Sequence, residues 1–186
     1  MSKNHIVLHH SATWDDKTKR DYDAIKAGHI RIGDRDIGYH WLIEYVNGKI
    51  VNEVGRAETD SAAACPGKNF DAIHICLVGN FQEVAPTEEE YRAVADKCRD
   101  IMTRWPIETI KGHREWYATA CPGKMFDVQY VRDLVKGGGT VVTTVDEALN
   151  VLQAKGLVKS PDYWHNASEC VKYLDTLLIN MANSLK

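Results

Sequence analysis

Three short segments carry residues that could act together in catalysis. His9 in LHHSAT, His113 in KGHRE and Cys121 in TACPGK each end or follow a predicted strand. Taken singly, such a histidine is usually a polar surface or packed core residue, and such a cysteine is usually packing. Together they supply two imidazoles and one thiolate, the ligand count of a catalytic zinc site that keeps its fourth position for water. The pattern therefore predicts one zinc ion per chain.

Two hydroxyl groups stand near these donors in the sequence. Thr119 lies two residues before Cys121, so in an extended segment both side chains project from the same face. Tyr39 in GYHW occupies a strand start, where its phenol could reach a cleft, whereas the neighbouring His40 must point to the opposite side. We therefore expect Tyr39 and Thr119, rather than His40, to lie beside the metal.

A repeated octamer leaves two candidates for the cysteine ligand. ACPGKNFD at 64–71 repeats ACPGKMFD at 120–127 with a single mismatch, so either Cys65 or Cys121 could be the ligand. The spacing from His113 and the adjoining Thr119 favour Cys121. We expect Cys65 to be a loop residue near the rim of the groove, and the recurrence itself has no explanation in the sequence.

The strands and helices expected around these residues indicate a mixed sheet flanked by helices. Asn47-Gly48 is a strong hairpin signal between two of the strands. Thr87 and Glu90 have capping-box spacing at the start of one helix, and Pro106 stops that helix. The expected strands are 6–9, 39–46, 49–54, 72–79 and 109–111, and the expected helices are 17–30, 88–105 and 127–136.

Three consecutive glycines predict a boundary near the end of the chain. We expect a catalytic domain at 1–136, a Gly-rich linker at 137–142 and a helical region at 143–186. In the last region Thr144 and Glu147 form a second capping box, and Gly156 stops that helix. A second helix is expected from Ser160-Pro161 onward, with the apolar stripe Cys170, Val171, Leu174, Leu178, Met181 and Leu185. Two helices bury little surface alone, so this region should dock on the first domain, another copy or a ligand.

Composition excludes several classes of partner. Lys and Arg number 23 against 26 Asp and Glu, so there is no cationic excess for nucleic acid or anionic membranes. No apolar run approaches the roughly 20 residues of a membrane span, and the apolar stretch near the start is too short for a signal peptide. Five cysteines, an odd number, do not imply a disulfide framework. We expect a protein made in the cytosol.

Several motifs in a fixed order make the chain resemble a known family over roughly residues 4–136. The most specific part is GH followed eight residues later by CPG. The family is that of the zinc-dependent N-acetylmuramoyl-L-alanine amidases, in the branch shared by phage lysis amidases and peptidoglycan recognition proteins. The motifs are LHHSAT (8–13), GYHW (38–41), the hairpin with Gly55-Arg56, AIHICLVGNF (72–81) and GHREWYATACPGKMF (112–126).

The resemblance implies an activity as well as a fold. It implies that His9, His113 and Cys121 bind zinc, that Tyr39 and Thr119 contribute to catalysis, and that zinc-activated water hydrolyses the amide between N-acetylmuramic acid and L-alanine in peptidoglycan. It further implies a phage or prophage endolysin, made in the host cytoplasm without a signal peptide and reaching the wall after the membrane is breached.

The chain departs from the family at several positions. Some phage members have a lysine where Thr119 stands, and other amidases place a glutamate, a general base, where this chain has Cys76. The general base is therefore unidentified; Glu115 is close in sequence to His113, but we expect it at the surface. A histidine often found before the AIHICLVG strand is replaced near Ala64.

Two other functions stay open. One is a peptidoglycan-binding protein without hydrolysis, although an intact ligand set argues against it. The other is a metal-free Cys121-His113 thiol hydrolase, against which Pro122 removes the backbone N–H best placed as an oxyanion donor.

The C-terminal helices resemble a region appended to amidases of clostridial type and their phages. This resemblance favours cell-wall targeting or self-association for residues 143–186. Tyr163, Trp164 and His165 could stack on sugar rings or form a packing cluster at the helix start, and both interpretations stay open.

Overall fold

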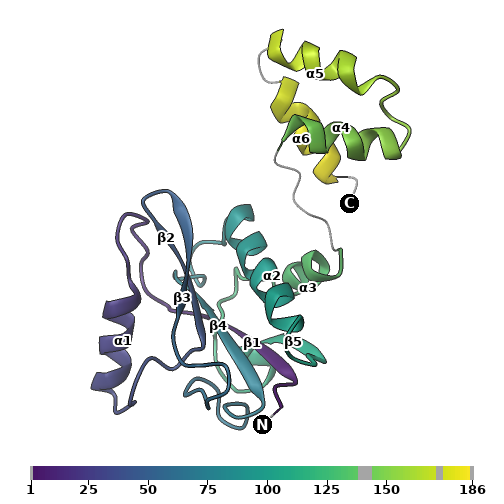
Figure 1. Cartoon of the computed structure of the whole chain (residues 1–186). Helices are drawn as coiled ribbons and strands as arrows, with labels where there is room; N and C mark the ends of the chain where they lie inside the picture. Colours follow the sequence, from purple (N-terminus) through teal and green to yellow (C-terminus); the bar gives the residue numbers. More distant parts are fainter. Residues whose placement is uncertain (1, 138–143, 171–173, 185–186) are drawn as a thin grey trace. The chain divides into compact units, whose positions relative to one another are not determined.

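The chain divides into two compact units, Met1–Lys136 and Gly137–Lys186, in the computed structural model (Figure 1). The structure describes residues 2–137, 144–170 and 174–184. The predicted linker falls almost wholly outside the described residues; only its first residue, Gly137, is described, at the end of a helix. Each unit is treated by itself below.

The first unit is built on a five-stranded mixed sheet with the order β3-β2-β4-β1-β5. β2 and β3 form the antiparallel hairpin that Asn47-Gly48 predicts, and β4 pairs in parallel with both β1 and β2. β5 pairs in parallel with β1 at the edge. The strands are β1 His5–His10, β2 Trp41–Val46, β3 Lys49–Val54, β4 Ala72–Leu77 and β5 Thr109–Gly112.

Helices cover both faces of this sheet, which confirms the predicted fold class. In Figure 1, α1 lies on one side of the sheet and α2 and α3 lie on the other. α2 begins with the predicted capping box, in which the Thr87 side chain accepts from the Glu90 backbone and the Glu90 side chain accepts from the Thr87 backbone. The helices are α1 Tyr22–Arg31, α2 Glu88–Met102 and α3 Val128–Gly137, with a short 3-10 helix, η1, at His113–Glu115.

Strand alternation gives the sheet one apolar face and one face with polar groups. Ile6 and Leu8 of β1 join the main core beneath α2 and α3. Val7 and His9 project from the other face, as do His74 and Cys76 of the neighbouring β4, because successive side chains of a strand point in opposite directions. The candidate chemistry therefore lies on the face away from the main core.

The first helix starts later than its sequence pattern predicts, at Tyr22 instead of Lys17. The Asp16 carboxylate accepts from the backbone N–H groups of Thr18 and Lys19, and Lys17 has φ +59°. A side chain that bonds nearby backbone groups in this way competes with helix formation. The helix therefore begins only after this turn.

The second unit contains three helices in its described residues, not the two expected. A single helix over residues 161–185 would be about 37 Å long. Instead α5 ends at Cys170 and α6 begins at Leu174, which lets Leu178 and Ala182 join the core around α4. Thr144 and Glu147 form the expected capping box. The helices are α4 Val145–Ala154, α5 Pro161–Cys170 and α6 Leu174–Ser184.

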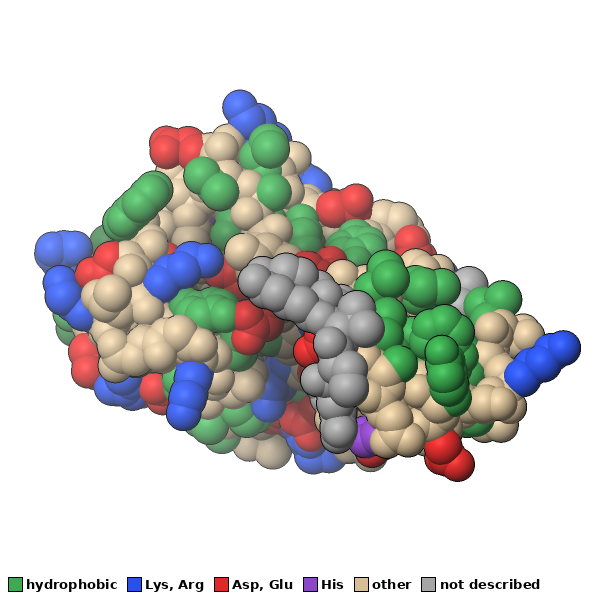
Figure 2. Space-filling model, turned by 90° about the horizontal axis from the view of Figure 1, so that it is seen from above, with side chains coloured by type: hydrophobic (Ala, Val, Ile, Leu, Met, Phe, Trp, Pro, Cys, Tyr) green, Lys and Arg blue, Asp and Glu red, His purple; other side chains and the backbone are tan. Residues whose placement is uncertain are grey.

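The stripe predicted for the last helix is only partly buried. Leu178 is buried and Leu174 packs against the core that contains it, but Met181 is exposed. Val171, Leu185 and the side chain of Cys170 lie outside what the structure describes. Leu157 and Leu177 are exposed as well. On the face of the molecule seen in Figure 2, hydrophobic side chains, drawn in green, gather in several places. Among the described residues, no helix is long and apolar enough to cross a membrane.

Candidate metal centre

The register of the parallel strands brings His9 and His113 together. Leu8 of β1 is paired with Gly112 of β5, so the residues that follow, His9 and His113, lie side by side at the carboxyl ends of the two strands. Their ring centres are 4.7 Å apart. Open α/β sheets commonly bind ligands at this end of the strands.

Cys121 reaches the same place from the loop before α3. Its Sγ lies 3.6 Å from Nδ1 of His9 and accepts a hydrogen bond from the His10 backbone N–H at 3.4 Å. Arg114 holds the loop by donating from its backbone N–H to the Cys121 carbonyl and from its guanidinium to the Phe126 carbonyl. The donor atoms of His9, His113 and Cys121 all lie within 4.8 Å of one another.

These three residues fit a zinc ion by chemistry and by spacing. Donors bound to tetrahedral zinc through nitrogen and sulfur are about 3.6 Å apart, which matches the distance between Cys121 and His9. Nε2 of His113 is buried and has no hydrogen-bond partner within the described part of the chain. A buried polar atom left without a partner is costly, and a metal ligand bond would satisfy it. Among the described residues, this is the single group of three or more such donors.

Burial sets the protonation of the donors. It lowers the pKa of His113, and it lowers that of His9 well below the ordinary value, with the neighbouring histidines adding to the effect. It raises the pKa of the Cys121 thiol to about 11. Without a metal, the two imidazoles are therefore neutral and the thiol stays protonated at neutral pH. Neutral imidazole is the form that binds metals, whereas the thiol must lose its proton on binding.

The two predicted hydroxyl residues line the same cleft as these donors. The cleft has a volume of about 400 Å³, and Tyr39, Thr119 and Gln82 contribute to its wall together with the three donors. Tyr39 lies with its ring centre 5.2 Å from that of His9, and burial raises the pKa of its phenol well above 10, so it remains a hydrogen-bond donor. The Thr119 oxygen accepts from the Cys121 backbone N–H, which leaves its own O–H free to donate.

The structure separates Tyr39 from His40 as their positions in the sequence predict. His40 does not line the cleft; it is buried, with Nε2 3.2 Å from the Asp60 carbonyl. Its Nδ1 accepts from the backbone N–H of His74. His40 therefore stabilises the strand next to the site.

Cys65 lies in a loop beside the cleft, as expected, but its side chain is buried and not at the rim. Its side chain is fully buried and packs with Val7, Ala72 and Trp116, because the turn that carries it folds inward against β1 and β4. It is absent from the group of donors. The neighbouring Ala64 does line the cleft.

Glu115 is exposed at the surface, as expected, and is already engaged in two interactions. Its carboxylate accepts from the Gly112 backbone N–H at 2.6 Å and forms an ion pair with Arg132 at 2.6 Å. Cys76, at the position where other amidases carry a glutamate, is fully buried, and burial raises its pKa well above 9. Neither side chain lines the cleft.

Sequence reasoning missed His74, which contacts His9 directly. The Nε2 of His9 lies 2.9 Å from Nδ1 of His74, and burial lowers the pKa of His74 to about 3, so this ring is neutral. One signal was available: His74 is the single polar residue in the strand AIHICL and shares its face with Cys76. A polar group inside such a strand needs a partner, and the partner strand carries His9.

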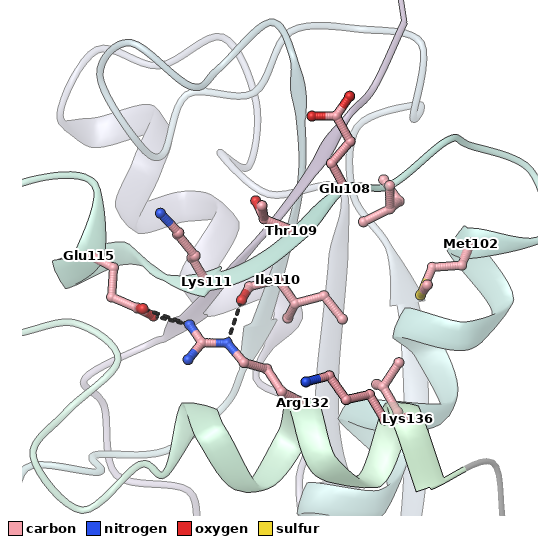
Figure 3. Close-up of a pocket in the computed structure, with 10 residues that line it drawn as sticks. Met102, Glu108, Thr109, Ile110, Lys111, Glu115, Arg132 and Lys136 are labelled. Carbon is pink, nitrogen blue, oxygen red and sulfur yellow. Dashed lines mark hydrogen bonds and ion pairs between the residues drawn. The ribbon is translucent and has the colours of Figure 1, made fainter.

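A larger cavity, of about 430 Å³, lies along the edge strand β5 (Figure 3). Figure 3 shows Arg132 reaching from α3 to Glu115 and to the carbonyl of Ile110. This contact occupies a backbone acceptor on the open edge of the sheet, a device that discourages further strands from adding there.

Comparison with known proteins gives one family and several relatives. Residues 1–124 match the family described as N-acetylmuramoyl-L-alanine amidase. A peptidoglycan-recognition protein of Drosophila simulans is 30% identical over 126 residues, which cover 64% of this chain and 68% of that protein. The endolysin of Escherichia phage T7 is 26% identical over 133 residues, covering 69% of this chain and 84% of that protein.

Solved structures agree with these relatives. The N-acetylmuramoyl-L-alanine amidase LysC from Clostridium intestinale URNW is 29% identical, with a TM-score of 0.64, over 73% of this chain and 87% of that chain. The bumblebee peptidoglycan recognition protein PGRP-SA, 24% identical with a TM-score of 0.62 over 69% of this chain and 80% of that chain, shares the fold. The predicted similarity to the fold of amidases and peptidoglycan recognition proteins is confirmed.

Proposed function

Because the chain belongs to the N-acetylmuramoyl-L-alanine amidase family, we propose that its first unit hydrolyses the amide between N-acetylmuramic acid and L-alanine in peptidoglycan. One zinc ion per chain is held by His9, His113 and Cys121. The observation that carries the proposal is the convergence of these three donors on a cleft that is also lined by two hydroxyl groups. The donor set fits zinc, and the cleft is open to a substrate chain.

When bound, zinc would supply a Lewis acid that lowers the pKa of a water and polarises the amide carbonyl. The chain's own residues do the rest. Tyr39 keeps its proton because its phenol is buried, so it donates a hydrogen bond to the oxygen of the amide as negative charge develops there. Thr119 donates from the same cleft wall, with its oxygen fixed by the Cys121 backbone.

A metal-free thiol hydrolase is disfavoured by the electrostatics of Cys121. A thiol acts as a nucleophile in its thiolate form, and burial raises the pKa of this thiol to about 11. Burial also lowers the pKa of His113, so this residue gives no cationic partner that would stabilise a thiolate. A non-catalytic peptidoglycan-binding protein remains the second candidate, since the relatives include proteins named for peptidoglycan recognition.

The second unit is proposed to serve cell-wall targeting or self-association. Its small core leaves Leu157, Leu177 and Met181 exposed. Of the aromatic group at the start of α5, His165 is engaged with Asp146 of α4 at 2.9 Å, whereas Tyr163 is 67% exposed and open to stacking on a sugar ring. We further propose a lysin of phage or prophage origin, made in the host cytoplasm and acting on the wall once the membrane is breached; the relatives named as phage endolysins support that origin.

One experiment tests the catalytic proposal. Purified protein is assayed for zinc content and for the release of new L-alanine amino termini from purified cell walls, before and after removal of the metal by a chelator. We expect about one zinc per chain, release of L-alanine termini, loss of release in the metal-free protein and recovery when zinc is restored. Wall binding without any release would favour the non-catalytic candidate, and full activity in the metal-free protein would favour the thiol hydrolase.

A further inference from the structure

We propose that His74 is a positioning residue for the metal centre, which fixes the tautomer of His9 so that Nδ1 of His9 faces the ion as an unprotonated donor. The inference rests on the metal centre proposed above and adds a residue outside the three ligands. It stands on a line of three hydrogen-bonding groups that runs from a backbone carbonyl to the cleft.

The line of hydrogen bonds begins at the Lys68 carbonyl, and the donor and acceptor of each bond follow from the chemistry of the groups. Nε2 of His74 lies 3.1 Å from the Lys68 carbonyl oxygen, which can only accept, so Nε2 carries the proton. Because burying an unpaired charge is costly, the fully buried His74 ring carries this one proton only, and its Nδ1 is then an acceptor. Nε2 of His9 lies 2.9 Å from that atom and must donate to it. Nδ1 of His9 is therefore left with its lone pair, 3.6 Å from Sγ of Cys121.

The fold holds His74 firmly in this position. Its side chain is fully buried, and its strand pairs with β1 in a register that puts His74 opposite Val7, one step along the same face from His9. Its backbone N–H donates to Nδ1 of His40 at 2.9 Å. A ring fixed in this way can orient its neighbour.

The carbonyl at the start of the line is fixed as well. It belongs to the turn formed by ACPGKNFD at 64–71, where Asn69 Oδ1 accepts from the backbone N–H groups of Ala64 and Cys65. The Lys68 backbone N–H donates to the Cys65 carbonyl. The repeated octamer thus contributes to one centre from both sides: its second copy carries the thiol of Cys121, and its first copy carries the carbonyl of Lys68.

A metal-bound histidine whose other nitrogen donates to a fixed acceptor is held in the right tautomer and is a better ligand. Loss of such an outer contact typically lowers metal affinity about 10- to 100-fold. We expect an effect of this size at His74, because its Nδ1 is the acceptor that the structure places beside the Nε2 proton of His9.

The test compares two replacements of nearly equal shape in the full chain. In His74→Asn the amide oxygen can take the place of Nδ1 and still accept from His9, whereas His74→Leu offers no acceptor. Both lose the contact with the Lys68 carbonyl, so that loss cancels in the comparison. Zinc affinity is measured by competition with a chromophoric chelator, and thermal unfolding of the metal-free proteins checks that both remain folded.

We expect His74→Leu to bind zinc about 10- to 100-fold more weakly than the unaltered protein, with His74→Asn recovering most of the loss. An equal loss in both variants would show that only the packing of the ring matters, and an unchanged affinity in His74→Leu would show no role at all; either result overturns the proposal. The unaltered protein in the same titration reports on the metal centre itself, separately from the ratio between the variants, and the release of L-alanine termini reports on the proposed hydrolysis.

A second measurement needs no variant. Long-range ¹H–¹⁵N NMR spectra of the metal-free protein at neutral pH distinguish the two tautomers of each histidine. We expect His9 to carry its proton on Nε2. A proton on Nδ1 of His9 would reverse the line of hydrogen bonds and overturn the proposal even if neither variant folds.

Discussion

The rings of His9 and His113 lie 4.7 Å apart although the two residues come from opposite ends of the first unit's sequence. Their proximity follows from the pairing of Leu8 with Gly112 in adjacent parallel strands, which places the next residue of each strand at the same edge. The loop with Cys121 then closes over this edge. The candidate centre therefore depends on strand register, and its parts can be tested one by one.

Cysteine replacement should separate the two copies of the octamer. Cys121→Ser is expected to lose most of the bound zinc, because it removes the thiolate donor, whereas Cys65→Ser should keep the metal because its side chain packs with Val7 and Ala72 away from the donors. Metal analysis of the purified proteins measures both. Zinc lost from Cys65→Ser and retained by Cys121→Ser would reverse the assignment.

Removal of the hydroxyl donors should affect rate and spare metal content. Tyr39→Phe and Thr119→Ala each delete a hydrogen-bond donor that lines the cleft, and loss of such a donor costs on the order of 100-fold or more in kcat. Kinetics on soluble muropeptides, with zinc content and thermal unfolding as controls, provide the measurement. Unchanged turnover in both variants would contradict the assignment, and a loss in one alone would leave the other as a packing residue.

Glu115 provides a contrast, because its carboxylate is tied to Gly112 and Arg132. Glu115→Gln keeps an oxygen that can accept from the Gly112 backbone, so we expect less than about a tenfold loss in kcat, whereas removal of a general base would cost roughly 100- to 10,000-fold. The measurement is kcat of Glu115→Gln against that of the unaltered protein. A loss in the larger range would identify Glu115 as the general base.

Acid should destabilise the metal-free protein through the buried His40. Burial lowers the pKa of His40 to about 4, while a histidine titrates near 6.5 in an unfolded chain. Between these values the unfolded state binds more protons, so the free energy of unfolding falls as the pH falls below about 6.5. From pH 7 to pH 5.5 the expected loss from this residue is about 1 kcal/mol. Urea unfolding at the two pH values measures it, and equal or greater stability at pH 5.5 would contradict the prediction.

Removal of the second unit should distinguish targeting from chemistry. A shortened protein that ends at Lys136 contains all the candidate site residues and one compact unit, so it should keep activity on soluble muropeptides. Binding to whole walls, or lysis of them, should fall. Cosedimentation with purified walls and muropeptide hydrolysis are measured side by side with the full chain. Loss of muropeptide hydrolysis or insolubility would mean that the three helices complete the amidase core.

The sequence by itself determined the local features, namely turns, helix caps and strand alternation, and it identified the fold class. The turn at Asn47-Gly48 and the capping residues Thr87 and Thr144 act over three or four positions, so their signals are complete within a short segment. Strand alternation likewise identified which of Tyr39 and His40 could reach a cleft. These preferences come from backbone conformation and near neighbours, which a single sequence carries in full.

Only the tertiary structure decided which distant groups meet. The contact of His9 with His74 depends on the register of β1 and β4, and the role of the Lys68 carbonyl depends on a turn that folds against them. Every residue has a backbone carbonyl, so the residue type at position 68 could not indicate that its carbonyl contacts His74. The burial of Cys65 and the packing of α6 residues Leu178 and Ala182 against α4 were not predicted for the same reason: both depend on long-range packing, which sums small contributions from residues far apart in the chain.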